Sequence, residues 1–434
     1  MGTGNLWNSL VEKEKYEEIQ NTILAAVKKH DGWRTTDCIN LHAGKNVMSR
    51  KARELLASPG LVDNSVAGAI GQRNATGACM IDEVESLAVA LLQRLFRAKH
   101  VEYRPMSGNL ANGIALCALT RPGDTIMVIP RKYYGHYSWQ ENGYPSFLGL
   151  QVKDIPFREG AAQLDLDAFR KLAVSLKPKV IVLGAFIPLF PIPLAEMKEI
   201  AESVGARIMY DGAHVMGLIA AQCFQDPTSE GAHLLVGSTQ KTLPGPIGGL
   251  LVCNDEDLAI RISAVTSAFL SNYGNNRIAA LAMTSAEMLR FGREYALAIL
   301  CNARVLAEAL NSEGLKVLHK SDGFTASHQV ILDAISWGGA RKVVAALEKG
   351  NIMATFFPLS TDYPHLLKSP NGVRLGVSAV TRLGMGKMEM EKIALFIRTL
   401  LDHPEQADKI GREVSNLAAQ FRKVHFCFDS HPPS

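Results

Sequence analysis

The chain contains 434 residues, 47% of them hydrophobic and 20% charged, a composition that predicts a folded protein with a large buried core. Its formal net charge is +4 and no long run of basic residues occurs, so the charge pattern gives no support for nucleic-acid binding. No apolar stretch approaches the ~18 uncharged residues of a membrane span, and seven scattered cysteines predict the reduced thiols of a cytoplasmic protein, with no disulfide framework and no metal site.

The first predicted element is a charged amphipathic helix over residues 7–30, where apolar residues recur at helical spacing. The spacing leaves open whether the apolar face covers the same chain or a second copy. A helix over 81–97 follows, and then a short strand that leads through Ser107, Gly108 and Asn109 into an apolar helix. The hydroxyl and N–H groups of that turn could hold an anion at the helix N-terminus, although such a turn can equally be a simple N-cap.

Apolar strands and helices then alternate up to residue 211 and indicate the fold class. After a strand near residue 128, the pattern predicts further strands and helices at 150–157, 165–176, 179–186, 194–204 and 206–211. Apolar strands that alternate with helices are typical of an α/β protein with a mostly parallel sheet covered on both faces. Active sites of such sheets lie at the carboxyl ends of the strands, where Asp211 and Ser107 fall.

One acid and one lysine stand at the ends of neighbouring predicted strands. Asp211 closes the strand 206–211, with His214 three residues beyond, and Lys241 lies at the bend between one apolar run that stops at Gly237 and another that begins at Leu250. Pyridoxal phosphate needs a carboxylate beside its ring nitrogen and an amine that forms a Schiff base with its aldehyde. Taken singly, the acid could be a strand-end cap and the lysine a solvated turn residue.

The C-terminal part predicts a smaller α/β domain. A long helix over 277–312 leads to a layer of strands and helices at 316–320, 328–334 and 339–349, and the tail 402–434 reads as a helix with a Pro/His-rich end. The predicted organisation is an N-terminal helical arm, a large cofactor-binding domain and a small C-terminal domain, at residues 1–45, 46–300 and 301–434.

Two segments resemble the serine hydroxymethyltransferase family. DGAHVMGLIAAQ (211–222) is similar to the family's D-x-A-H-x-x-G-L-x-A, and STQKTLPGPIGG (238–249) is similar to T-T-H-K-T-L-R-G-P-R-G-G. The resemblance extends from about Leu41 to about Ile397. It implies a fold type I, aspartate-aminotransferase-like enzyme that uses pyridoxal phosphate, with Lys241 as the Schiff-base lysine. It also implies a homodimer, or a dimer of dimers, in which the N-terminal arm packs on the partner subunit.

The resemblance further implies the roles of individual side chains. It places the ring-stacking histidine at His136, and it places Tyr273 and Gly274 at the cofactor of the neighbouring subunit. Arg374, in GVRLGVSAVTRLGM (372–385), becomes the clamp for the substrate carboxylate, which an arginine fork binds in bidentate fashion; Arg382 is interpreted as an ordinary ion-pair partner. The remaining implied cofactor contacts are Ser107, Gly108, Asn109, Asp211, His214, Ser238 and Gln240.

At three places the sequence departs from the family pattern. The family's catalytic glutamate falls on Lys45, a phosphate-binding tyrosine falls on Ser65, and Asn74 begins a pair that replaces Tyr-Tyr. We therefore count Lys45, Ser65 and Asn74 among the candidate substrate-binding residues, and Lys45 also among the candidate catalytic residues with Lys241, His136, Asp211 and His214. Their identities argue against the folate-dependent reaction of the family.

The retained residues predict activation of an α-amino acid. The first interpretation is cleavage or formation of the Cα–Cβ bond of a β-hydroxy-α-amino acid by a folate-independent aldolase or transaldolase, with an aldehyde as acceptor. Alternatives are decarboxylation or an oxygen-consuming step on a specialised amino acid, a true folate-dependent serine hydroxymethyltransferase, and a non-catalytic homologue. The last is disfavoured because Lys241, Asp211 and Arg374 are all present.

Overall fold

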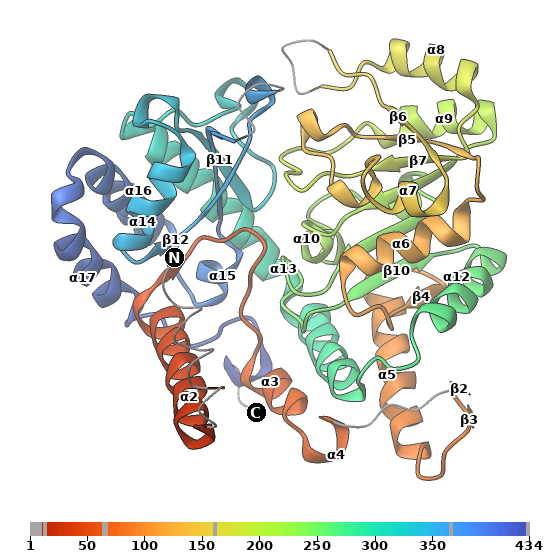
Figure 1. The fold of residues 1–434 in the computed structure, drawn as a ribbon, viewed down its shortest axis with the longest axis horizontal. Coiled ribbons are helices and arrows are strands. Elements are labelled where there is room, and N and C mark those ends of the chain that lie inside the picture. The colour runs from red at the N-terminus through yellow and green to blue at the C-terminus, as the bar shows by residue number, and fades with distance from the viewer. Residues whose placement is uncertain (1–10, 12–14, 63–67, 159–162, 364–367, 431–434) are drawn as a thin grey trace.

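The computed structural model describes residues 11, 15–62, 68–158, 163–363 and 368–430, which form two bodies joined by the long helix α13 (Asn275–Ser312) (Figure 1). Ser65 lies outside the described residues. None of the described helices combines the length and the hydrophobicity that a membrane span requires. The division into three domains at residues 45 and 300 stays a prediction.

A seven-stranded sheet forms the centre of the larger body, in the order β4-β10-β9-β8-β7-β5-β6. Strands β5 to β9 pair in parallel, whereas β10 runs antiparallel to both β9 and β4. The predicted α/β class with a mostly parallel sheet is therefore confirmed. The strands are β4 (His100–Glu102), β5 (Thr125–Val128), β6 (Gln151–Asp154), β7 (Val180–Leu183), β8 (Arg207–Asp211), β9 (Leu234–Ser238) and β10 (Gly249–Cys253).

Helices cover both faces of this sheet, as the apolar strands predicted. In β7, Val180 and Val182 pack into one hydrophobic cluster, while Ile181 and Leu183 pack into another on the opposite face. Alternation of this kind gives each face of the strand its own core. The helices of this body are α5 (Cys79–Phe96), α6 (Gly108–Leu119), α7 (Tyr144–Leu148), α8 (Leu166–Leu176), α9 (Leu194–Val204), α10 (Met216–Ala220), α11 (Pro227–Glu230) and α12 (Glu256–Phe269).

The smaller body contains a three-stranded antiparallel sheet in the order β11-β14-β13. The predicted strand at 316–320 is wrong: Val317 makes one isolated bridge to Leu332, and a 3₁₀ turn begins at Lys320. The backbone leaves extended geometry there because His319 has a positive φ of 59°. The elements are β11 (Gln329–Asp333), β13 (Thr355–Phe357), β14 (Gly372–Gly376), α14 (Ala340–Lys349), α15 (Ser378–Arg382), α16 (Lys387–Asp402) and α17 (Ala407–Ala418).

A segment from near the N-terminus completes the smaller body. Strand β1 (Ile39–Asn40) pairs in parallel with β12 (Ile352–Met353), and the Gly376 N–H donates to the Leu41 carbonyl at 2.7 Å. Residues 42–46 are thereby held beside β14. The hairpin β2 (Gly68–Ala69) and β3 (Gln72–Arg73) projects from the far end of the larger body (Figure 1).

The described part of the predicted helix 7–30 is α2 (Tyr16–Gly32), and residues 7–10 and 12–14 of that prediction lie outside the described residues. It buries none of its side chains, and Tyr16, Ile23, Leu24 and Val27 are exposed. Two short helices follow β1, namely α3 (Arg50–Leu56) and α4 (Pro59–Val62). Among the described residues, the apolar side of α2 is therefore not covered.

Candidate functional site

Seven of the predicted site residues line one cavity at the carboxyl ends of the parallel strands and the N-terminus of α6. The strand order brings β7, β8 and β9 side by side, so residues 184–186, Asp211 and Ser238 meet at one edge. The predicted residues that line it are Gly108, Asn109, His136, Asp211, His214, Ser238 and Lys241.

Lys241 lies in the turn between β9 and β10, and its side chain makes no hydrogen bond or ion pair with the residues that the structure describes. Burial, together with the charge of Arg374, lowers the pKa of Lys241 to about 8, although Asp211 acts in the opposite direction. A lysine with this pKa is partly neutral near physiological pH and can act as a nucleophile. The backbone is fixed by Asn46, whose side-chain amide donates to the Lys241 carbonyl.

Asp211 is a buried carboxylate that accepts two hydrogen bonds from the protein. The side-chain amide of Asn112 donates to it at 2.8 Å, and so does the backbone N–H of Ala213 at 2.8 Å. Burial raises the pKa of Asp211, while these hydrogen bonds and the charge of Lys241 oppose the rise. Gly184 has a φ of 125°, and a Cβ there would lie 2.2 Å from the Asp211 carbonyl oxygen, so only glycine fits at this close approach.

The two predicted histidines are held in their neutral forms. His136 Nδ1 lies 2.8 Å from Ser138 Oγ, and its pKa is lowered to about 4 by burial and by the charges of Lys241 and Arg131. His214 Nδ1 lies 3.1 Å from the side-chain amide of Gln329, and burial holds its pKa well below the usual range. Neutral imidazoles can exchange protons with a ligand without adding positive charge to the cavity.

Arg374 reaches the same region from β14 of the smaller body. Its Nη1 donates to the Phe186 carbonyl at 2.9 Å and its Nε to Thr355 Oγ1 at 3.3 Å, but no described carboxylate lies within ion-pair distance. Burial lowers its pKa to about 10. By contrast, Arg382 is fully buried 3.1 Å from Glu287, which confirms its interpretation as an ion-pair partner. The Arg374 fork is therefore left available for a carboxylate that the protein does not supply.

The N-terminus of α6 has the properties of an anion site. Ser107 is its N-cap and accepts from the Leu110 N–H at 3.1 Å, while a Cβ at Gly108 would lie 2.2 Å from Ser238 Oγ. The side-chain oxygens of Asn109 and Gln240 are buried without a described partner, and as acceptors they call for a donor on a ligand. A ligand with an anionic group at one end, an aldehyde near Lys241 and a basic nitrogen near Asp211 fits this arrangement. No described group of His, Cys, Asp or Glu could hold a metal ion.

Other predicted residues lie away from this cavity. Lys45 is partly buried. It lies in the region of Arg374, because both charges act on His42, whose pKa is lowered to about 4 by burial, by Arg374 and by Lys45. Asn74 is exposed beside β3. Neither Lys45 nor Asn74 lines the cavity of Lys241.

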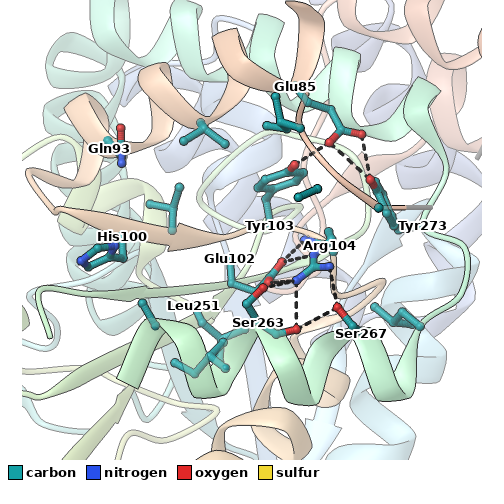
Figure 2. Close-up of a pocket in the computed structure, with 18 of the residues that line it drawn as sticks. Glu85, Gln93, His100, Glu102, Tyr103, Arg104, Leu251, Ser263, Ser267 and Tyr273 are labelled. Atoms are coloured by element: carbon teal, nitrogen blue, oxygen red, sulfur yellow. Dashed lines mark hydrogen bonds and ion pairs between the residues drawn. The ribbon is translucent and has the colours of Figure 1, made fainter. Parts of the chain in front are cut away.

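Tyr273 faces a second cavity, shown in Figure 2. Its hydroxyl bonds the buried carboxylate of Glu85 at 2.9 Å, which also pairs with Arg73 at 2.7 Å. Gly274, with a φ of 68°, precedes α13. Neither residue lines the cavity that holds Lys241 of its own chain, so their contact with a neighbouring subunit's cofactor stays a prediction.

Several residues that support the site were not predicted. Asn112 is a buried polar residue in the mostly apolar helix α6, a signal that could have identified it. Asn46 joins the Lys241 carbonyl to the Tyr295 hydroxyl, and Gln329 joins His214 to the Phe186 carbonyl. These contacts link segments far apart in the sequence, which no local pattern reveals.

The chain matches a family model, named relatives and a solved structure. The family model described as serine hydroxymethyltransferase matches residues 17–397. Proteins named serine hydroxymethyltransferase from Methanopyrus kandleri and Methanothermobacter thermautotrophicus are 40% and 39% identical, covering 94% and 97% of this chain and 95% and 97% of theirs. The crystal structure of an L-threonine transaldolase from Pseudomonas fluorescens, 24% identical, superimposes with a TM-score of 0.84 over 97% of this chain and 96% of that one. It shares the fold.

Proposed function

Because the chain belongs to the serine hydroxymethyltransferase family, we propose that it makes or breaks the Cα–Cβ bond of a β-hydroxy-α-amino acid without using folate. Membership makes it a pyridoxal-phosphate-dependent enzyme of the transferase and aldolase type. The finer statement rests on one observation: a lysine, Lys45, stands where the family pattern has its catalytic glutamate.

The residues around the cavity supply what the cofactor needs. Lys241 would hold its aldehyde, Asp211 its ring nitrogen, and the α6 N-terminus with Ser238 and Gln240 its phosphate, while His136 would lie against the ring and His214 beside it. When bound, pyridoxal phosphate acts as an electron sink that weakens the bonds at the Cα atom of an amino acid.

The chain's own residues decide which bond reacts. The Arg374 fork would grip the substrate carboxylate, and Phe186 and Thr355 hold that fork in place through its Nη1 and Nε atoms. Fixing the carboxylate orients Cα and therefore selects the bond that can break. The neutral His136 and His214 can take or return the proton of the substrate hydroxyl, because their lowered pKa values keep them unprotonated.

Lys45 supports the folate-independent reaction. A carboxylate beside the substrate can accept and relay a proton at neutral pH, whereas an ammonium group cannot unless its proton is first removed. The altered Ser65 and Asn74 positions point the same way.

An ordinary folate-dependent serine hydroxymethyltransferase is the second candidate. It is favoured by the name and by the nearly full-length coverage of the relatives at 38–40% identity. We also propose a homodimer, supported by the exposed apolar side chains of α2.

Assays with and without tetrahydrofolate separate the two candidates. We expect wild-type turnover of serine, threonine and a bulky β-hydroxy amino acid to change by less than about twofold on adding tetrahydrofolate, because Lys45 cannot act as the family glutamate does. Lys45→Glu should gain folate-stimulated serine cleavage, whereas the matched Lys45→Gln, which removes the charge without adding a base, should not. Strong folate stimulation of serine turnover by the wild type would instead establish the second candidate.

The lowered pKa of Lys241 should also determine how the rate of pyridoxal phosphate binding to the apoprotein depends on pH. The protonated amine cannot attack an aldehyde, so the rate at which the apoprotein regains visible absorbance with pyridoxal phosphate should rise with pH and level off above a midpoint near 8. Stopped-flow measurements between pH 6 and 10 give the profile, with Nα-acetyllysine as the unburied control. A rate that keeps rising tenfold per pH unit above pH 9 would show that Lys241 keeps the ordinary pKa of 10.5.

A further inference from the structure

Two arginines add positive charge beside the cavity, whose lining contains one acid, Asp211, and one lysine, Lys241. Asp211 is the one acidic side chain among the described residues that line the cavity, and its hydrogen bonds are already made with Asn112 and Ala213. Arg374 is reserved by the proposed function for the carboxylate of the amino acid. A second guanidinium nearby, that of Arg131, has no role in that scheme.

Arg131 lies on the 3₁₀ turn Arg131–Tyr133, directly after β5. Its guanidinium carbon is 5.7 Å from the centre of the Phe186 ring, and that of Arg374 is 5.6 Å from the same centre. Phe186 lines the cavity of Lys241. Both guanidinium groups therefore lie over the ring of a residue that lines the cavity, although neither arginine lines it, and their central carbons can be no farther apart than the sum of those two distances.

A structural role explains this arginine poorly. Its one described polar contact is a long 3.5 Å hydrogen bond from Nη1 to the Gly135 carbonyl, and no described carboxylate lies within ion-pair distance. A contact with an aromatic face is worth about 0.5–1 kcal/mol at an exposed site. Against this gain, two guanidinium groups and Lys241 repel one another in a partly buried space. The repulsion is felt locally, since the charge of Arg131 helps to hold His136 neutral.

An anionic ligand group between these cations would reverse that repulsion. We infer that the aldehyde acceptor carries its own anionic group, a carboxylate or a phosphate, which Arg131 binds while Arg374 holds the carboxylate of the amino acid. The inference rests on the proposed function and narrows its substrate to anionic aldehydes. Arginine suits the task because its planar fork donates two parallel hydrogen bonds to either group.

The reaction of such an acceptor balances without an added oxidant or reductant. With glycine as donor, a Cα–H bond breaks, its proton goes to a base of the site, and the electron pair left at Cα forms the Cα–Cβ bond with the aldehyde carbon. The π pair of the C=O bond moves to the oxygen, which takes up one proton, so that no proton is gained or lost overall. Cleavage is the reverse, with the hydroxyl proton leaving as the C=O bond reforms. Arg131 would fix the far end of the aldehyde so that its carbonyl carbon faces Cα.

Matched pairs of aldehydes test the inference. With glycine as donor, the wild type should use succinic semialdehyde better than butyraldehyde, and glycolaldehyde phosphate better than glycolaldehyde; the pair with the larger ratio tells carboxylate from phosphate. Arg131→Leu should lower kcat/KM for the preferred anionic aldehyde by about 10- to 100-fold and for its neutral partner by less than about threefold. Arg131→Lys should keep part of the preference, and Lys132→Leu, at the exposed neighbouring lysine, should keep all of it.

A binding measurement keeps the two proposals separate. Succinate and inorganic phosphate, which cannot react, should bind the glycine-saturated holoenzyme in calorimetric titrations, and Arg131→Leu should weaken the tighter of them by about 10-fold or more. If no aldehyde yields product but Arg131→Leu still weakens anion binding, the proposed reaction is wrong and the anion site at Arg131 is supported. If Arg131→Leu lowers the use of charged and neutral aldehydes equally, or if neither anion binds in an Arg131-dependent way, the anion site is wrong.

Discussion

Replacing Lys241 with alanine should give a folded protein that no longer retains pyridoxal phosphate covalently. The variant should lose the visible absorbance of the bound cofactor after dialysis, and its turnover should fall by about 10³-fold or more, because the amine that captures the cofactor and carries protons at the site is gone. The structure contains no second lysine on the cavity wall among the described residues to take over the role. Absorbance spectra and turnover of the dialysed variant check both statements.

Lys132 provides the matched control for that experiment. It is also a lysine close to the site in sequence order, four residues before His136, but it is exposed and does not line the cavity. Lys132→Ala should keep the wild-type spectrum and activity within about twofold. An unchanged resting spectrum in Lys241→Ala would mean that another amine holds the cofactor.

Arg374→Lys should weaken the binding of the amino-acid substrate by about 2–3 kcal/mol, a loss of roughly 30- to 150-fold, while cofactor content stays the same. Lysine keeps the positive charge but cannot present the two parallel donors of a guanidinium fork. The substitution would also remove the hydrogen bonds that Arg374 donates to the Phe186 carbonyl and to Thr355 Oγ1. Titration of the holoenzyme with glycine, followed by its visible spectrum, measures the effect.

Arg341→Lys is the control for the same change elsewhere in the smaller body. Arg341 is an exposed residue of α14. Its guanidinium carbon lies 4.4 Å from the centre of the ring of Phe356, a residue of β13, the strand next to β14. Its replacement should leave glycine binding within about twofold. If Arg374→Lys titrates like Arg341→Lys, the substrate carboxylate is held by some other group.

The sequence predicted the sheet and the centre of the site because both depend on local patterns. The apolar runs of β8 and β9 end at Asp211 and Ser238, which line the cavity, so the strand pattern and the topology of parallel sheets are enough to bring Asp211 and Lys241 together. Helix α9 begins and ends at the predicted residues 194 and 204. The segment 316–320 looked equally regular, but the left-handed backbone of His319 ends it.

Long-range contacts could not be predicted in this way. Asn46 reaches the Lys241 carbonyl, and Gln329 reaches both His214 and the Phe186 carbonyl. Such hydrogen bonds depend on how the two bodies are placed, which composition and periodicity do not specify. The same holds for Arg131, whose neighbour Phe186 comes from another strand end.

The pairing of β1 with β12 sets an order for biosynthesis. Residues 39–40 leave the ribosome early, yet their strand partner at 352–353 is made more than three hundred residues later. The seven-stranded sheet ends at Cys253, so it can assemble while β1 still waits for its partner. The loop that carries Lys45 and Asn46 follows β1 directly, and therefore it reaches Lys241 only when synthesis is nearly finished. A nascent chain that stalls before residue 352 would hold the cofactor half of the site and lack the substrate half.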